Sequence, residues 1–398
     1  MTRLLFLTES FHPVLGGGEG HIRVLARRLA EAGLPSIVLT RGIDPAWPRE
    51  ETLDGARVVR VGPAGRGRGG KYAMVGPVLR ALFHERDAFD LLVVRGTRVL
   101  GLPGLAAARV LGKPVVMQPE VNGELSGEVY TWGTRYHVPA VRRAVTAGVR
   151  LRNLFFRDAD AFVAMSRAMA REFLSAGVAP ERVVHLPHGV DTDRFRPASR
   201  SERADVRARL GIPETNLVAT FTGRLLRGKG LVPLIEAFAV VAKEEPRLRL
   251  RIVGSGEGQT LSVEPELKEL VGRLGLPDRV CFTGRVDDVA DHLRASDLFV
   301  FPSEFEGLGI SLVEAAACGL PAVGARTGGI VDVIEDGASG LLFEPGNATG
   351  LASALRSLAG DPARREAMGG RARQIALDRF DLVDSVSRYA ALFRELHA

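Results

Sequence analysis

Two glutamates frame a strand, a glycine-rich loop and the start of a helix in one stretch of the sequence, FPSEFEGLGISLVEAAACGLPAV (residues 301–323). Glu306 lies in the loop, and Glu314 lies in the helix-like run that follows. Backbone N–H groups at the start of a helix lack partners, and the helix dipole adds about half a positive charge there. The carboxylates would repel a phosphate, but they can accept hydrogen bonds from sugar or ribose hydroxyls. A plain strand–helix junction is the structural alternative.

A basic, glycine-rich turn follows an earlier strand, in FTGRLLRGKG (residues 221–230). Gly223 to Lys229 fits the G-x4-G-K opening of a phosphate-binding P-loop, which next requires Ser or Thr to hold magnesium. Gly230 stands at that position, so the pattern argues against a nucleotide triphosphatase. A structural turn that is merely basic is the alternative to a phosphate site.

Two further glycine clusters have weaker signals. Gly16, Gly17 and Gly18 separate the first strand from the first helix, where glycines permit positive φ and a close approach of the backbone to a phosphate or sugar. Such a triplet by itself is more often a flexible turn. The run GRGRGG (residues 65–70) matches G-x-G-x-x-G, but the ribose-binding acid of a dinucleotide site is missing, and we interpret the run as a mobile loop.

The elements that must position these residues alternate between short apolar strands and helices. A chain of 398 residues suits two domains. The alternation runs through the first half, stops at a polar segment from Arg196 to Arg200, and then restarts, which predicts two Rossmann-like, doubly wound parallel sheets of the α/β class with ligands at the carboxyl ends of the strands. The predicted domains are residues 1–197 and 198–378, and the last helix forms a third segment, residues 379–398.

Composition suggests a soluble protein of the cytoplasm. No apolar run approaches the roughly 18 residues of a membrane span, and the N-terminal segment reaches Glu9 too early for a signal peptide. Cys281 and Cys318 both lie in apolar segments, which predicts reduced, buried thiols.

Charge is unevenly shared between the two halves. Residues 1–197 hold 28 Lys and Arg against 19 Asp and Glu, a net charge of +9, whereas residues 198–398 hold 25 against 28, a net charge of −3. A basic half suggests an anionic partner, although a bias toward arginine in the composition explains it equally well. A nucleic-acid partner is not expected, because aromatic residues are only 6% of the chain and no recognition motif is present.

One segment of the basic half reads as an amphipathic helix, VRRAVTAGVRLRNLFFR (residues 141–157). Helical spacing places Val141, Val145, Val149 and Phe155 on one side and the arginines largely on the other. Such a helix can lie on an anionic membrane, so peripheral contact at the inner face of the cell membrane is one expectation. An ordinary surface helix is the other.

Taken together, these motifs resemble family 4 retaining glycosyltransferases of the GT-B fold. Residues 301–323 are similar to the Glu-x7-Glu signature of that family, residues 223–230 to its Gly-Arg…Lys-Gly segment, and HGVDTDRFRP (residues 188–197) to the segment that ends its first domain. The resemblance covers nearly the whole chain and is most specific in residues 215–345.

The resemblance implies two Rossmann-like domains facing a cleft and transfer of a sugar, with retention, from a UDP- or GDP-linked donor to an acceptor hydroxyl in glycan, polysaccharide or glycolipid synthesis. Arg224 and Lys229 would stabilise the departing diphosphate without a metal, Glu306 would orient the donor sugar and Glu314 the ribose, and Val286 would contact the base. Of these residues, Arg224, Lys229 and Glu306 are predicted to be catalytic. The predicted donor site comprises Gly17, Gly18, Arg224, Lys229, Val286, Glu306, Leu308, Gly309, Ile310, Ser311 and Glu314.

The acceptor side departs from the family pattern. Many members have a histidine after the strand that corresponds to residues 114–118, where this chain reads MQPEVNG. Glu120 or Asn122 takes that position, and His188 is the one histidine in a family-like segment. Asp191 and Asp193 have the spacing of a metal-binding D-x-D motif, but the surrounding segment suggests caps and turn formers. We expect no cofactor and no metal beyond the nucleotide sugar as co-substrate.

The acceptor is predicted only by class: a glycan, a glycolipid or a small molecule. A catalytically inactive partner subunit that binds a sugar nucleotide is the alternative function, because the acceptor-side histidine is missing. A Rossmann oxidoreductase lacks a properly placed fingerprint.

Overall fold

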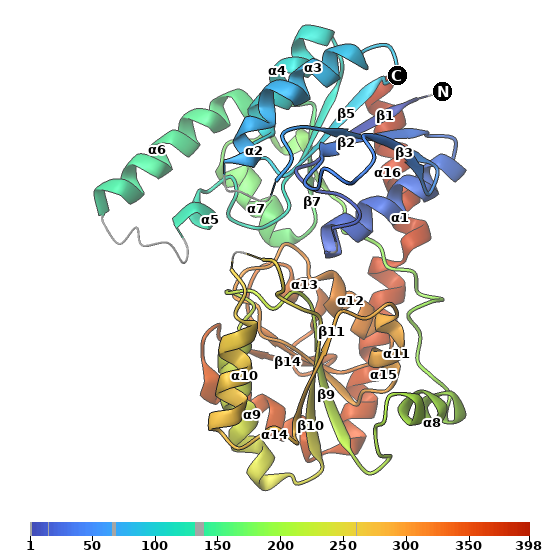
Figure 1. Cartoon of the computed structure of the whole chain (residues 1–398), viewed down its shortest axis with the longest axis vertical. Helices are drawn as coiled ribbons and strands as arrows, with labels where there is room; N and C mark the ends of the chain where they lie inside the picture. Colours follow the sequence, from blue (N-terminus) through green and yellow to red (C-terminus); the bar gives the residue numbers. More distant parts are fainter. Residues whose placement is uncertain (1, 15, 66–68, 132–138, 260) are drawn as a thin grey trace. The chain divides into compact units, whose positions relative to one another are not determined.

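The computed structural model describes residues 2–14, 16–65, 69–131, 139–259 and 261–398, and within these ranges the side chains of residues 131, 139, 140 and 142 are not described. The chain divides into two compact units: Met1–Pro187 with Val383–Ala398, and His188–Leu382. Figure 1 shows the elements of each unit. The candidate GRGRGG loop lies partly outside the described residues, at 66–68.

The first unit is built on an eight-stranded sheet of order β3-β4-β2-β1-β5-β6-β7-β8. All its strand pairs are parallel except β3 with β4, a hairpin that sequence analysis did not foresee because β3 is half exposed and rich in glutamate. Its strands are β1 (Leu4–Leu7), β2 (Ser36–Arg41), β3 (Glu50–Leu53), β4 (Ala56–Val61), β5 (Leu91–Arg95), β6 (Val115–Gln118), β7 (Ala161–Ala164) and β8 (Val183–His185). Its helices are α1 (Gly17–Glu31), α2 (Gly70–Ala73), α3 (Val75–His84), α4 (Gly101–Leu111), α5 (Glu128–Thr131), α6 (Pro139–Phe156), α7 (Arg167–Ser175), the 3₁₀ turn η1 (Pro180–Arg182) and the last helix α16 (Leu382–His397).

The C-terminal helix α16 belongs to the core of the first unit. Phe393 is fully buried and meets Phe6 of β1 edge to face, with ring centroids 6.3 Å apart. The hydroxyl of Tyr389, also fully buried, accepts a 2.7 Å hydrogen bond from Gln118 Nε2 at the end of β6. The last helix of the chain therefore packs against a sheet whose strands come from the N-terminal half of the sequence.

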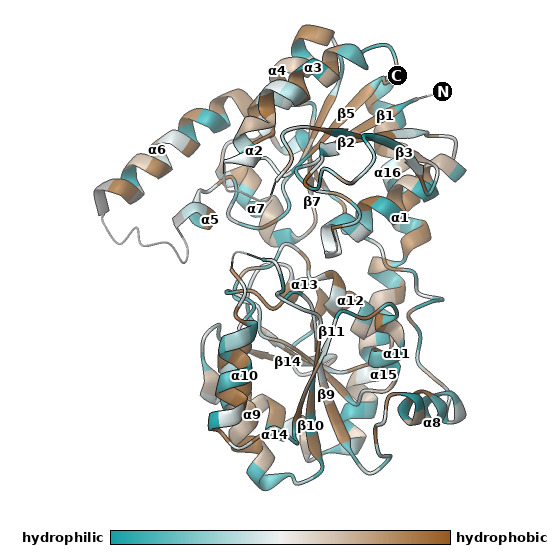
Figure 2. Cartoon of the chain, in the orientation of Figure 1, coloured by the Kyte–Doolittle hydropathy of each residue, from teal (hydrophilic) through white to brown (hydrophobic). Residues whose placement is uncertain are grey.

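The second unit is built on a six-stranded parallel sheet of order β11-β10-β9-β12-β13-β14. Figure 2 shows the apolar character of these strands, which helices cover. The strands are β9 (Leu217–Thr222), β10 (Leu248–Val253), β11 (Val280–Gly284), β12 (Leu298–Phe301), β13 (Ala322–Ala325) and β14 (Gly340–Phe343). The helices are α8 (Arg200–Arg209), α9 (Leu231–Glu244), α10 (Glu264–Arg273), α11 (Val289–Arg294), α12 (Ile310–Ala317), α13 (Ile330–Val333), α14 (Ala348–Ala359) and α15 (Pro362–Phe380).

Cys318 is buried as predicted, whereas Cys281 is exposed. The prediction of two buried thiols is therefore wrong for Cys281, because β11 is the edge strand of its sheet and leaves one face of the strand open to solvent.

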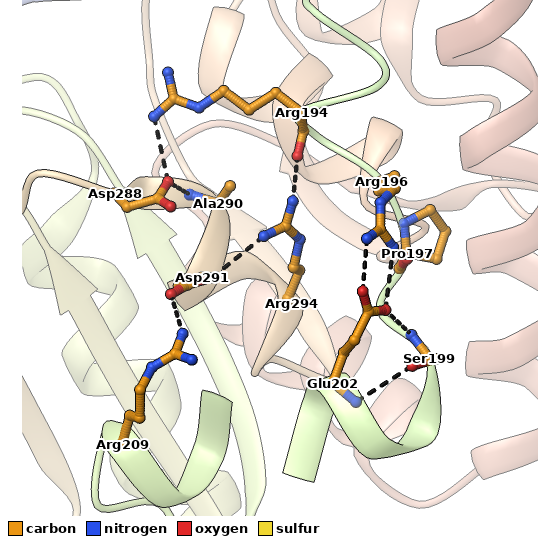
Figure 3. A network of polar contacts seen from close by, with 10 residues as sticks. All are labelled: Arg194, Arg196, Pro197, Ser199, Glu202, Arg209, Asp288, Ala290, Asp291 and Arg294. Atoms are coloured by element: carbon orange, nitrogen blue, oxygen red, sulfur yellow. Dashed lines mark hydrogen bonds and ion pairs between the residues drawn. The ribbon is translucent and has the colours of Figure 1, made fainter. Parts of the chain in front are cut away.

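The polar segment around residues 196–200 is tied to the second unit, which begins at His188, before the boundary expected at residue 197. Figure 3 shows the ties: the carbonyl of Arg194 accepts a hydrogen bond from Arg294 of α11, and Arg194 pairs with Asp288 at 3.2 Å. Ser199 and Glu202 form a capping box at the start of α8. Proline and charge in a sequence suggest a linker, but here the arginines find carboxylate and carbonyl partners on the same unit.

Candidate active site

The loop that follows β12 brings together two of the residues predicted to be catalytic. Lys229 Nζ donates a 2.7 Å hydrogen bond to Glu306 Oε2, and both side chains are only partly exposed, at 25% and 15%. Lys229 Nζ also lies 5.9 Å from the centre of the Phe301 ring. An ammonium and a carboxylate separated by 77 positions in the sequence are thus held as one pair at the carboxyl edge of the sheet.

The loop before helix α9 is fixed by a close backbone crossing. Gly230 is the N-terminal cap of α9 with φ of +66°, and a Cβ at this position would lie 2.0 Å from the carbonyl oxygen of Pro302. The amide of Glu304 also donates to the carbonyl of Gly228 at 2.9 Å. Neither Ser nor Thr fits at residue 230, which gives the physical reason why this turn departs from the P-loop pattern.

The predicted anion cradle is formed by the start of α12. Gly309 caps the helix with φ of +87°, and a Cβ there would approach a ring carbon of Phe301 to 2.8 Å. No side chain caps this N-terminus, so the first amides of α12, including those of Ile310 and Ser311, are available to a ligand. Leu308, also predicted in the donor site, is buried under the loop.

Sequence analysis missed the support beneath Glu306. A Cβ on Gly328 would lie 2.1 Å from the Glu306 carbonyl oxygen, and the amide of Gly329 donates to that carbonyl at 3.3 Å. The Thr327 hydroxyl donates to the Glu304 carbonyl at 3.2 Å. The signal was present as the TGG run at residues 327–329, but only the crossing of two loops explains why glycine is required there.

Glu314 lies in α12 and is partly buried. Burial raises the pKa of its carboxyl to about 7, against the opposing charge of Arg194. A carboxyl group of this kind can accept hydrogen bonds from neutral hydroxyls when it is ionised.

The other two donor-site predictions in this unit lie in loops at the same sheet edge. Arg224 follows β9 and its side chain is exposed, with no hydrogen bond or ion pair within the described residues. Val286 follows β11 and is half exposed. Arg224 is therefore free to bind an anion, and Val286 offers an apolar contact.

The first unit collects a different group of residues at the carboxyl edge of its own sheet. Gly17 and Gly18 form the first turn of α1 rather than a separate turn, and Gly16, the cap, has an extended φ of −172°. Positive φ is thus not the reason for these glycines. A Cβ on Gly18 would lie 3.7 Å from Glu120 Oε1 and 3.9 Å from Arg95 Nη2, so the start of α1 lies against the loop after β6.

Glu120 and Asn122 lie in that loop, which is organised by a buried carboxylate. Glu124 is fully buried and accepts hydrogen bonds from the amide and hydroxyl of Thr97 at 2.9 and 2.7 Å, and from the amides of Glu120 and Val121 at 3.1 and 3.3 Å. Burial raises the pKa of Glu120 to about 6, with Arg95 opposing the shift. Sequence analysis missed Glu124, because its four donors come from two separate loops.

Cations gather near Glu9, which follows β1. Burial raises the pKa of Glu9, while the charges of Arg98, Lys71 and Arg41 lower it. Arg41 is nearly buried at the end of β2, and its Nε and Nη1 find no acceptor within the described residues. This edge therefore offers positive charge from three separate segments of the chain.

His188 is buried at the start of the second unit, whereas Glu120 and Asn122 belong to the first unit. Asp191 is a turn former, as predicted: its Oδ1 accepts hydrogen bonds from the amides of Asp193 and Arg194 at 3.2 and 3.0 Å. In the described part of the chain, no three His, Cys, Asp or Glu side chains are grouped to hold a metal ion. None of the helices in that part has the length and apolar character that a membrane crossing requires.

Two α/β units, each built on a sheet that is mainly or wholly parallel, are the architecture of GT-B proteins, and comparisons with known proteins show that the chain is a glycosyltransferase of this fold. The family model described as Glycosyl transferases group 1 matches residues 202–375, and that described as Glycosyltransferase Family 4 matches residues 15–194. The chain belongs to glycosyltransferase family 4, which confirms the resemblance seen in its motifs.

Relatives and solved structures of similar proteins cover nearly the whole chain. D-inositol 3-phosphate glycosyltransferase 1 of Catenulispora acidiphila is 32% identical over 95% of this chain and 91% of its own length. The D-inositol 3-phosphate glycosyltransferase of Geodermatophilus obscurus is 31% identical over 91% and 81%. The fold is similar to that of sucrose-phosphate synthase from Thermosynechococcus elongatus, with a TM-score of 0.84 at 23% identity over 100% and 99% of the two chains. It is also similar to Anabaena HepE in complex with UDP-glucose, with a TM-score of 0.78 at 24% identity over 99% and 100%.

Proposed function

We propose that this glycosyltransferase transfers a sugar with retention from a UDP- or GDP-linked donor to an acceptor hydroxyl, without a metal ion. The observation that carries the proposal is the Lys229–Glu306 pair beside the uncapped start of α12. The pair combines a group that binds phosphate with a group that binds sugar hydroxyls, next to amides that bind an anion.

The second unit would bind the donor through residues with separate roles. Arg224 and Lys229 contact the diphosphate, aided by the amides of Gly309 to Ser311. Glu306 holds Lys229 in place and accepts hydrogen bonds from the sugar, Glu314 accepts them from the ribose, and Val286 packs against the base. Negative charge that develops on the leaving diphosphate is then met by fixed cations rather than by a metal.

Retention follows from a front-face displacement in this proposal. The bond between the anomeric carbon and the β-phosphate oxygen breaks, and the bond to the acceptor oxygen forms on the same face of the sugar. The acceptor's proton passes to the leaving phosphate oxygen. Arg224 and Lys229 stabilise the phosphate while it accepts that proton, so no protein nucleophile is needed.

The first unit would bind the acceptor. Glu120 and Asn122, in the loop held by Glu124, occupy the place of the family histidine and contact the acceptor or the transferred sugar beside Gly18. The names of the relatives support an acceptor that carries a phosphate, and Arg98, Lys71 and Arg41 supply matching charge near Glu9. We place the reaction in the cytoplasm, where nucleotide sugars are used and both cysteines stay reduced.

Thermal stability in the presence of UDP, GDP or ADP, with and without EDTA, tests the donor site. A nucleotide at about one hundred times its dissociation constant adds roughly 2.7 kcal/mol to the free energy of unfolding. We expect one nucleotide to stabilise the protein equally with and without EDTA, and the matching radiolabelled sugar nucleotide to be consumed with an acceptor. Stabilisation without any turnover would favour the inactive partner subunit, and loss of turnover in EDTA would overturn the metal-free mechanism.

A further inference from the structure

Helix α6 has two opposite sides that differ in their surroundings. One side carries Val149, Asn153 and Phe156, which are at most 7% exposed and face the rest of the first unit. Val149 lies against Gly127, and Asn153 Nδ2 donates a 2.7 Å hydrogen bond to the carbonyl of Leu125. These polar and apolar contacts hold one side of α6 (Figure 1) against the first unit, whereas side chains on its other side are exposed.

The open side is apolar. Leu151, Leu154 and Phe155 are 61%, 52% and 57% exposed, and their spacing of three and four residues places them on one face. The small residues Ala144, Ala147 and Gly148 continue this face toward the start of the helix and are also exposed. The sequence-based prediction that Phe155 shares a side with Val149 is wrong: Phe156 is buried on the side of Val149, whereas Phe155 is exposed.

A row of arginines borders the apolar face. Arg143 and Arg150 are seven residues apart, a spacing that keeps them on one edge of the helix, and both are exposed. Arg157, also exposed, follows in the turn after the helix ends at Phe156. The helix itself contains no Asp or Glu. Figure 2 shows apolar and polar positions along α6. An exposed apolar face beside a purely basic edge matches a surface that is both apolar and anionic.

We propose that this face of α6, defined by Leu151, Leu154, Phe155, Arg143 and Arg150, docks on the surface of an anionic lipid bilayer. The three large apolar side chains enter the boundary between head groups and acyl chains, and the arginines bind lipid phosphates. The bilayer explains both features at once, whereas an acidic protein surface would leave the apolar side chains unmatched.

Docking would bring the acceptor loop to the membrane. Arg152, at the flank of α6, donates 2.6 Å hydrogen bonds to the carbonyl of Glu124 and to the hydroxyl of Tyr130, so the helix holds the loop that carries Glu120 and Asn122. That loop then lies about one helix diameter, ~10 Å, from the lipid head groups. This consequence rests on the proposed function, and it favours an acceptor presented by a lipid.

Co-sedimentation with vesicles tests the docking independently of transfer. We expect the full chain to bind vesicles of phosphatidylcholine and phosphatidylglycerol in a 3:1 ratio and to bind phosphatidylcholine alone much more weakly, with binding reduced by salt. Leu151→Ser with Phe155→Ser should weaken binding at least tenfold, because each large apolar side chain contributes strongly on burial. Arg143→Gln with Arg150→Gln should weaken it about tenfold or more, since each arginine near an anionic surface contributes roughly fivefold.

Matched control variants distinguish binding by this face from nonspecific hydrophobic or electrostatic binding to vesicles. Val110→Ser with Val240→Ser removes exposed apolar surface from α4 and α9, and Arg86→Gln with Arg109→Gln removes the same charge from other exposed sites of the first unit. If the α6 variants bound vesicles as well as the wild type does, the proposal would be overturned. It would also be overturned if the control variants lost as much vesicle binding as the α6 variants.

Failure of the docking proposal is distinguishable from failure of the proposed function. Stabilisation by the nucleotide is measured on the same variants without vesicles and should match that of the wild type, since the substituted residues belong to the first unit and the proposed donor site to the second. Nucleotide binding without vesicle binding would overturn only the docking. Vesicle binding without nucleotide binding would support the docking and count against the transferase.

Discussion

The two sheets each present functional side chains at their carboxyl edges, but they assemble them differently. In the second unit, the cation, the carboxylates and the free helix N-terminus come from two short stretches, residues 223–230 and 303–314. In the first unit, the corresponding edge draws on the ends of β1, β2, β5 and β6, on the first turn of α1 and on the loop that Glu124 organises.

This difference matches the tasks that we assign to the two units. A diphosphate needs charge and amides at fixed spacing, which one loop and one helix start can supply. An acceptor pocket built from many loops can change its specificity by changing one of them while the sheet stays intact. Variants that affect one edge and leave the other unaffected test this division.

The largest expected effect is on the donor edge. Lys229→Ala should lower the rate of transfer by about 10²–10³-fold, because a fixed cation at the leaving group is lost. Initial rates with saturating sugar nucleotide measure it. Arg227→Ala, a neighbouring exposed arginine of the same loop, is the control and should stay close to wild type. A Lys229→Ala enzyme with normal turnover and a normal melting temperature would remove the residue from the mechanism.

The loop crossing in the second unit should be intolerant of any side chain. Gly230→Ser restores the P-loop pattern but places a Cβ 2.0 Å from the Pro302 carbonyl in a backbone of positive φ. We expect a loss of about 2–4 kcal/mol in the free energy of unfolding. Gly20→Ala, in α1 with open space around it, should instead stabilise the chain by roughly 0.5–1 kcal/mol. Chemical denaturation measures the free energy of unfolding of both variants. A Gly230→Ser protein as stable as the wild type would contradict the close crossing of the two loops.

In the first unit, the corresponding test removes the buried carboxylate of Glu124. Glu124→Ala leaves four donors around residues 97 and 120–121 without their acceptor, which should cost about 3 kcal/mol of stability. It should also raise the KM for the acceptor while leaving nucleotide binding by the second unit unchanged. Glu181→Ala, an exposed acid of the same unit, serves as the reference. Weakened nucleotide binding in the Glu124 variant would show that the two edges are not separate.

A further expected effect is the pH dependence set by Glu314. Burial raises the pKa of this carboxyl to about 7 from an ordinary value of 4.5. Between those values the unfolded chain has released the proton that the folded chain retains, so this group makes stability fall as pH rises from about 4.5 to 7. Glu314→Gln should remove that penalty. The stability of the variant relative to the wild type should therefore be higher at pH 8 than at pH 5.

Nucleotide binding should show the opposite trend at the same residue. The ionised carboxylate accepts ribose hydroxyls, so wild-type affinity for the nucleotide should rise severalfold from pH 6 to pH 8. Glu314→Gln should bind about tenfold more weakly at pH 8 and lose this dependence. Calorimetric titration at the two pH values measures it, and parallel profiles for both proteins would exclude Glu314 from the ribose site.

Much of the fold was predictable because its signals are local. The alternation of apolar strands and helices predicted two doubly wound sheets, and each unit is built on one such sheet. Apolar runs, glycine punctuation and helical spacing act over a few neighbours, and a parallel sheet buried on both faces makes its strands conspicuous. The antiparallel β3 was missed, because half-exposed strands rich in glutamate have no such signal.

By itself, the sequence determined the α/β class, the family motifs and which polar side chains belong to the loops of the second sheet, since Arg224, Lys229, Glu306 and Glu314 are close to glycines that define those loops. Only the tertiary structure decided which groups meet across the chain. Examples are the pairing of Lys229 with Glu306, the glycines 328–329 beneath that loop, the four donors around Glu124, and the outward position of Phe155 on α6. Local patterns record what a short segment can do alone, whereas hydrogen bonds and burial between distant segments depend on how the whole unit packs.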